Sequence, residues 1–109
     1  MSDSFKDRER GEEAKYALDQ ETEFKVMARR NKLLGQWAAE LFSLQGDESE
    51  AYVKSVILSD LEEAGDDDVF RKLRGDFDAY SVERTDQQIR EQMAKLLPIA
   101  RDQVLNDAD

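Results

Sequence analysis

The chain has 109 residues and contains neither cysteine nor histidine. The missing cysteines exclude disulfides, thiolate nucleophiles and Cys-ligated metal sites, and the missing histidines remove the usual general base at neutral pH and the commonest metal ligand. With 16 basic and 26 acidic side chains, the net charge of −10 repels phosphate backbones and argues against a nucleic-acid partner. These limits indicate one small domain that binds another macromolecule and is not an enzyme.

The sequence gives no sign of a membrane segment or a targeting signal. No charge-free run approaches the ~20 residues that a membrane-spanning helix needs. The start, Met1-Ser2-Asp3-Ser4, has no basic segment followed by an apolar stretch, so we expect no secretory signal and a cytoplasmic protein. The chain also lacks a Gly-x-x-x-x-Gly-Lys-Ser/Thr phosphate loop, so any nucleotide binding is expected to be weak.

The N-terminal segment differs in pattern from the rest of the chain. Between Asp3 and Glu23, 12 of the 21 residues are charged, and the few large apolar side chains make no continuous stripe. Charge pairs at helical spacing each support a helix by only ~0.3 kcal/mol, which cannot hold an isolated helix firmly. We therefore expect residues 1–19 to form a loose arm that becomes ordered on a partner, and residues 20–109 to form the folded domain.

Charge is distributed unevenly between the two parts. Residues 1–32 hold 8 basic and 8 acidic side chains, so the whole net charge of −10 falls on residues 33–109. An arm that is neutral and mixed in sign suits a polar cleft on a partner better than a phosphate backbone.

Four apolar stripes with spacings of three and four residues follow the arm, and they predict helices and no strands. Gly46-Asp47 and Gly65-Asp66 each combine a glycine stop with an acidic N-cap candidate, and Thr85-Asp86-Gln87-Gln88 is a capping box. Short connections favour antiparallel neighbours, so the predicted fold is an all-α four-helix bundle. The stripes are Phe24, Met27, Ala28, Leu34, Trp37, Ala38 and Leu41; Val53, Val56, Ile57, Leu61 and Ala64; Val69, Phe70, Leu73, Phe77 and Tyr80; and Ile89, Met93, Leu96, Leu97, Ala100 and Val104.

Four single residues carry specific structural expectations. Gly35 and Gly75 lie inside helical patterns at a cost near 1 kcal/mol each, which a close approach of two helices would explain. Trp37 is expected to pack in the core because it lies on an apolar stripe. Pro98 is expected to bend the last helix because it removes a backbone donor.

Two clusters of charge need an interpretation. The acidic run from Glu62 to Asp68 lacks the Asp-x-Asp-x-Asp-Gly calcium loop, and the preference of acids for helix N-termini explains it, so no metal site is expected. The basic group Arg29, Arg30 and Lys32 either solvates a helix face or contributes to binding, and the sequence leaves both readings open.

Several segments along the chain match one known family. They are Asp7-Arg8-Glu9-Arg10, Glu13-Ala14-Lys15-Tyr16, Phe24-Lys25, the unbroken block from Ala28 to Leu41, Glu50-Ala51-Tyr52, the stretch from Glu62 to Lys72, and Gln88-Ile89-Arg90. On these segments, which span nearly the whole chain, the protein resembles the zeta subunit, the ATPase inhibitor of F-type ATP synthases in alpha-proteobacteria.

The resemblance implies a four-helix bundle with a mobile inhibitory arm. In that family the arm enters a catalytic interface between alpha and beta subunits, becomes helical there, and stops the rotor from turning in the hydrolytic direction. The implied partners are the alpha, beta and gamma subunits of the catalytic sector, and the implied protein is a monomer when free, peripheral to the membrane-bound enzyme and without a cofactor. Carried over by position, the partner-binding residues are Phe5, Asp7, Arg8, Glu9, Arg10, Glu13, Lys15 and Tyr16.

The arm departs from the family pattern at three positions. Gly11 and Glu12 stand where Ala and an aromatic residue are more usual, and Leu18 stands where a polar residue is commoner. A glycine weakens the arm helix by ~1 kcal/mol, and the absent aromatic residue removes an anchor. One alternative from another class stays open, a small helical protein that senses an adenine nucleotide or another ligand weakly in a shallow groove of the bundle.

Overall fold

The computed structural model describes the backbone of residues 2–60 and 66–107 and the side chains of residues 20–60 and 66–106. Its elements are four helices: α1 (Ser2–Leu41), α2 (Gly46–Ser59), α3 (Asp66–Ala79) and α4 (Asp86–Asp107). No strand occurs in this part of the chain, which confirms the prediction of an all-α four-helix fold.

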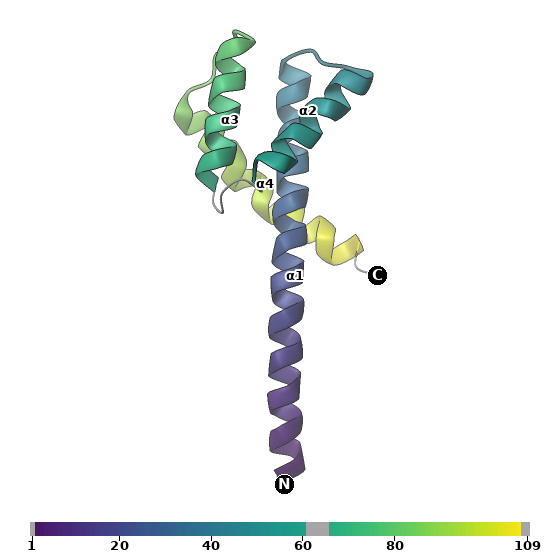
Figure 1. Cartoon of the computed structure of the whole chain (residues 1–109). Coiled ribbons are helices and arrows are strands. Elements are labelled where there is room, and N and C mark those ends of the chain that lie inside the picture. Colours follow the sequence, from purple (N-terminus) through teal and green to yellow (C-terminus); the bar gives the residue numbers. More distant parts are fainter. Residues whose placement is uncertain (1, 61–65, 108–109) are drawn as a thin grey trace.

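Helix α1 sets the shape of the molecule (Figure 1). Its 40 residues correspond to a length of ~60 Å, close to the longest dimension of the molecule, 65 Å. The C-terminal half of α1 contacts α2, α3 and α4, and α4 crosses α1 near its middle. The N-terminal half projects away from the other three helices (Figure 1).

A buried row of side chains on α1 lies at the centre of the bundle. Val26, Arg30, Leu34 and Ala38 follow one another at intervals of four residues, and all are at most 1% exposed. This spacing keeps successive side chains on one side of a helix. The stripe differs from the predicted one at its start, because Val26 is the buried residue there, whereas Phe24 lies two positions, or about 200°, around the helix and is 66% exposed.

Aromatic rings from three parts of the chain meet where α1 ends. The ring of Phe42 lies 4.9 Å from that of Phe77 and 5.4 Å from that of Tyr52, both near edge-to-face, and stacks on Tyr80 at 4.3 Å. Trp37 packs against Phe77 with a centroid distance of 5.3 Å, which agrees with its predicted core position. These contacts join α1, α2 and α3 at one end of the bundle.

A hydrogen bond from a buried phenol links α2 to α3. The hydroxyl of Tyr52 donates to Asp76 Oδ2 over 2.8 Å, and Lys72 Nζ donates to the same oxygen over 3.0 Å. Burial, with the hydrogen bond and the charge of Asp76, raises the pKa of Tyr52 above its ordinary value. The phenol therefore stays neutral and keeps its proton for this bond.

Serine residues follow the last turn of two helices, and at the end of α1 a serine takes the place of the predicted Gly46. Ser43 after α1 and Ser81 after α3 have φ values of 61° and 58°. In each case the N–H of the serine and the N–H of the next residue donate to carbonyl oxygens in the last turn of the helix, for example Leu44 N–H to Ala39 O over 2.9 Å. This pair of bonds is the Schellman motif. Gly46 also has a positive φ of 58°, but it begins α2, whose N-cap position is Gln45 with no side-chain capping bond. The Asp47 cap was therefore wrong, and Gly65 lies outside the described residues.

The predicted capping box at the start of α4 is confirmed. Gln88 N–H donates to Thr85 Oγ1 over 3.1 Å, and Thr85 N–H donates to Gln88 Oε1 over 2.9 Å. Both partners of the reciprocal pair are therefore satisfied, as the Thr-x-x-Gln pattern predicts. Pro98 lies inside α4, and its predicted bend stays a prediction.

Helices α1 and α2 cross closely at Gly35. A Cβ at this position would lie 3.0 Å from Val53 Cα and 3.4 Å from side-chain atoms of Val56. The predicted close approach is therefore confirmed for Gly35. It is wrong for Gly75, where a Cβ would meet no atom within 4 Å.

A buried arginine joins α1 to the first residue of α3. Arg30 is 1% exposed, and its Nη2 donates to Asp66 Oδ1 over 2.8 Å while its Nε donates to Asn31 Oδ1, also over 2.8 Å. Asp66 is 52% exposed, so only the arginine has lost its water. A buried charge of this kind depends on its partner for compensation.

We expect opposite effects from alanine at the two helical glycines. Gly75→Ala adds helix propensity in open space and should raise the free energy of unfolding by about 0.5–1 kcal/mol. Gly35→Ala adds the same propensity but forces the α1–α2 backbones apart, and it should lower that free energy by about 1–3 kcal/mol. Urea unfolding of both variants measures the difference, and a stabilised Gly35→Ala protein would contradict the close crossing.

We also expect Asp66 to matter more than its neighbour. Asp66→Asn leaves the buried Arg30 charge without its counter-ion and should cost about 2–4 kcal/mol of unfolding free energy. Asp67→Asn is the matched control, because it removes the same charge from the first turn of α3 but only an exposed 3.4 Å pair with Arg90. It should cost about 1 kcal/mol or less. Equal losses in thermal or urea unfolding would rule out a special role for the Arg30 pair.

Candidate functional site

The predicted arm forms the N-terminal half of α1. The helix begins at Ser2 and runs without a break into the bundle, so residues 2–19 extend ~27 Å along its axis. The side chains of the predicted partner-binding residues lie outside the described part of the chain, and the structure describes only the helical course of their backbone. These residues are Phe5, Asp7, Arg8, Glu9, Arg10, Glu13, Lys15 and Tyr16.

The base of the arm is tied to α4. Glu23 accepts hydrogen bonds from Arg101 Nη2 over 2.8 and 3.0 Å, and Val26 is the first buried side chain of the described part of α1. Val26 packs with Ala100 and Val104 in a small second core cluster. The direction in which α1 leaves the bundle is therefore set by packing on α4.

An open groove of about 530 Å³, here called the basal groove, lies where the arm meets the bundle. Two of its large apolar side chains are largely exposed, Phe24 at 66% and Leu105 at 57%. Neither side chain belongs to the small second core cluster of Val26, Ala100 and Val104. The groove is lined by Thr22, Phe24, Lys25, Ala28, Arg29 and Lys32 of α1, Ile57 of α2, and Val104 and Leu105 of α4.

The basal groove is positively charged on an otherwise acidic protein. Lys25, Arg29 and Lys32 are spaced by four and three residues and so share one side of α1, and no carboxylate is among the described residues that line the groove. Arg29 Nη1 donates to Gln103 Oε1 over 3.1 Å, whereas both lysines are exposed.

The basic group of the sequence does not act as one unit. Arg30 is buried and structural, while Arg29 and Lys32 line the basal groove with Lys25. Sequence reasoning treated the three neighbouring cations together and missed Lys25. Helical spacing was the available signal, because positions 25, 29 and 32 fall on one side of a helix and position 30 falls on another.

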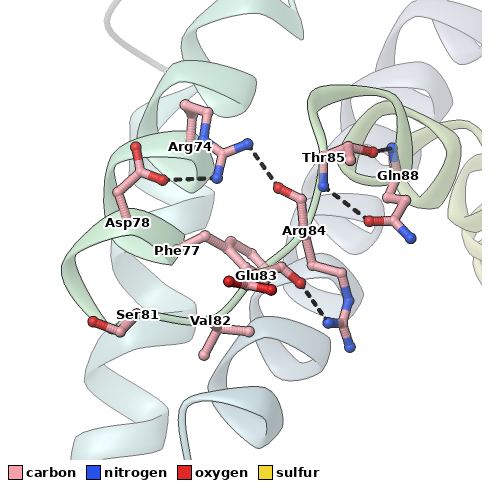
Figure 2. A pocket seen from close by; sticks show the side chains of 9 residues that line it. All are labelled: Arg74, Phe77, Asp78, Ser81, Val82, Glu83, Arg84, Thr85 and Gln88. Atoms are coloured by element: carbon pink, nitrogen blue, oxygen red, sulfur yellow. Dashed lines mark hydrogen bonds and ion pairs between the residues drawn. The ribbon is translucent and has the colours of Figure 1, made fainter.

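A second hollow, of about 630 Å³, lies at the corner between α3 and α4 (Figure 2). Arg74 crosses it, donating from Nη1 to the carbonyl oxygen of Arg84 over 2.8 Å and from Nη2 to Asp78 over 2.8 Å. Thr85 and Gln88 are bonded to each other at its edge (Figure 2). These polar groups already hold the corner together, so the hollow gives the nucleotide-sensing alternative no support, and that alternative stays a prediction.

The described part of the acidic run lies at the start of α3, where the sequence places it. Asp66, Asp67 and Asp68 lie in the first turn of α3, the location expected of helix-capping acids, while Glu62 and Glu63 are outside the described residues. In the described ranges, no group of three or more acidic side chains is placed to hold a metal ion. None of the helices described has an apolar stretch long enough to span a bilayer.

Comparisons with known proteins agree with this architecture. A structure solved by NMR in solution is similar to the chain, with a TM-score of 0.68, 42% sequence identity, and coverage of 77% of this chain and 95% of that one. A comparison with curated protein sequences found no match. The model of the family described as ATPase inhibitor subunit zeta matches residues 1–103, which include the arm and nearly all of the four helices. The chain therefore belongs to the family of the ATPase inhibitor subunit zeta.

Proposed function

We propose that the chain inhibits ATP hydrolysis by the F-type ATP synthase by inserting its arm, residues 1–19, at a catalytic interface between alpha and beta subunits. The inserted helix blocks rotation of the gamma subunit in the hydrolytic direction. The chain acts as a bound obstacle, without a catalytic group or cofactor of its own, and is a monomer when free. It works in the cytoplasm, at the periphery of the membrane-bound enzyme.

The observation that carries this proposal is the continuity of α1. One helix contains both the projecting arm and the core stripe of the bundle, and the family match covers both. If a flexible linker joined the arm to the bundle, the bundle would not determine the direction in which the arm points. Here the bundle fixes that direction through Val26 and the Glu23–Arg101 pair.

Continuity also lowers the cost of ordering the arm. Starting a helix is the unfavourable step, because several residues are fixed before the first hydrogen bond forms. The bundle holds the C-terminal half of α1 in helical form, so the arm extends an existing helix and avoids this step.

The pattern of the arm suits a cleft with both polar and apolar walls. Positions 5, 9, 12 and 16 fall on one side of a continuous helix, and positions 8 and 15 fall on the neighbouring side. The first set contains Phe5, Glu9 and Tyr16, and the second contains Arg8 and Lys15. We propose that these residues, with Asp7, Arg10 and Glu13, form the contact with the partner.

Deleting residues 1–18 should abolish inhibition of ATP hydrolysis while the protein keeps its fold. The core stripe begins at Val26, so the melting temperature should change by no more than about 2 °C, since a change of 1 kcal/mol corresponds to roughly 4–8 °C in a domain of this size. Co-purification with the catalytic sector and a hydrolysis assay provide the functional readout. Full inhibition by the shortened chain would contradict the proposal.

The double substitution Gly11→Ala and Glu12→Phe should strengthen inhibition. Alanine adds ~1 kcal/mol of helix propensity, which corresponds to a roughly five-fold lower half-inhibitory concentration. Phenylalanine at position 12 adds an aromatic ring on the same side of the helix as Phe5 and Tyr16. Gly75→Ala is the matched control, because it stabilises a bundle helix and should leave inhibition unchanged. Equal or weaker inhibition by the double variant would argue against helical insertion.

A further inference from the structure

We propose that the basal groove is a second docking site, which binds an acidic segment with large apolar side chains on the catalytic sector beside the cleft that receives the arm. This inference rests on the proposed function and extends it from the arm to the bundle. The groove would hold the bundle against the partner, while the arm performs the block.

The apolar part of the argument is the exposure of Phe24 and Leu105. They lie together in one concave surface with Val104 and the half-buried Ile57. Large aromatic side chains at the centre of a concave patch are typical anchors of protein interfaces. A groove of about 530 Å³ is large enough to take side chains from a partner, since ligand pockets measure ~300–1,000 Å³.

The charge of the groove indicates which partner would fit. The domain as a whole is acidic, so an acidic surface is repelled by most of the bundle. Around Lys25, Arg29 and Lys32 it meets three neighbouring cations, and no carboxylate is among the described residues that line the groove. Complementary charge of this kind selects one orientation of approach and raises the rate of association.

The position of the groove places it next to the arm's own binding cleft. Its first lining residue, Thr22, is three residues beyond the arm, a distance of about 5 Å along the helix axis. A partner that encloses the arm as far as residue 19 therefore reaches the edge of the groove. Contact with the bundle at this point requires no bending of α1.

A protein segment fits these features better than a membrane surface. Helices that bind an anionic bilayer lie flat and present a continuous apolar face flanked by basic residues. Here the apolar side chains line a hollow between three helices, and residues 33–109 carry the net charge of −10 that such a bilayer repels.

The test uses full-length charge-reversal variants in the hydrolysis assay. Lys25→Glu with Lys32→Glu should raise the half-inhibitory concentration at least roughly ten-fold and flatten its dependence on salt, because groove and partner would then repel each other. Maximal inhibition at saturation should be unchanged, because the arm is intact. The matched control is Lys54→Glu with Lys95→Glu, two exposed lysines outside the groove, which should shift the concentration less than about two-fold.

The apolar contact is tested separately. Phe24→Ala should raise the half-inhibitory concentration several-fold, mainly through faster dissociation. Ile99→Ala removes a large apolar side chain that is 41% exposed outside the groove, and it should have no such effect. Since Phe24 is 66% exposed, its removal should leave the melting temperature within about 2 °C of wild type.

The outcomes separate the two proposals. If wild-type protein inhibits and the groove variants inhibit at the same concentration, the second docking site is wrong and the proposed function stands. If wild-type protein does not inhibit, the proposed function fails and the docking site fails with it. Groove-dependent cosedimentation with phosphatidylserine vesicles, with no change in inhibition by the variants, would assign the groove to a membrane surface and overturn the inference.

Discussion

The structure depends on one constraint: helix α1 is packed inside the bundle along its C-terminal half and projects from it along its N-terminal half (Figure 1). The C-terminal half of α1 is the shared partner of the other three helices, and the missing Cβ of Gly35 lets α2 approach it closely. The N-terminal half has no apolar stripe to bury and extends beyond them. Because both halves belong to one helix, packing in the bundle decides where the arm points. Stability and partner contact are therefore separate in sequence but joined through the same backbone.

Parts of the fold whose causes are local in sequence could be predicted. The Thr85–Gln88 box was predictable because both partners lie within four residues and bond each other. Gly35 and Gly75 had the same local pattern, yet only Gly35 has a helix against it, and that difference is tertiary. Phe24 was misplaced because apolar character alone cannot fix the rotation of a helix. Ser43 was missed because a serine with positive φ has no sequence signal comparable to glycine.

The site was predictable to a different degree. The arm residues came from resemblance to a family, and the match over residues 1–103 supports the family and not each residue's role. The basal groove was missed because it needs Ile57 and Leu105 as well as α1, and helices far apart in sequence bring them together only after folding. Arg30 was grouped with its neighbours because its burial depends on Asp66, 36 residues away. Contacts of this range are absent from local patterns.

The unbroken course of α1 also has a mechanical consequence. A force that pulls on the arm acts along the axis of α1, because no hinge separates the arm from the core stripe. Such a load is directed along the contacts that α1 makes with α2 and α4, so we expect these contacts to be strained together. Resistance to it is governed by the rate of unfolding and not by the equilibrium free energy. The Gly35 crossing with α2 and the Arg30–Asp66 pair with α3 are among the contacts that such a load would have to break.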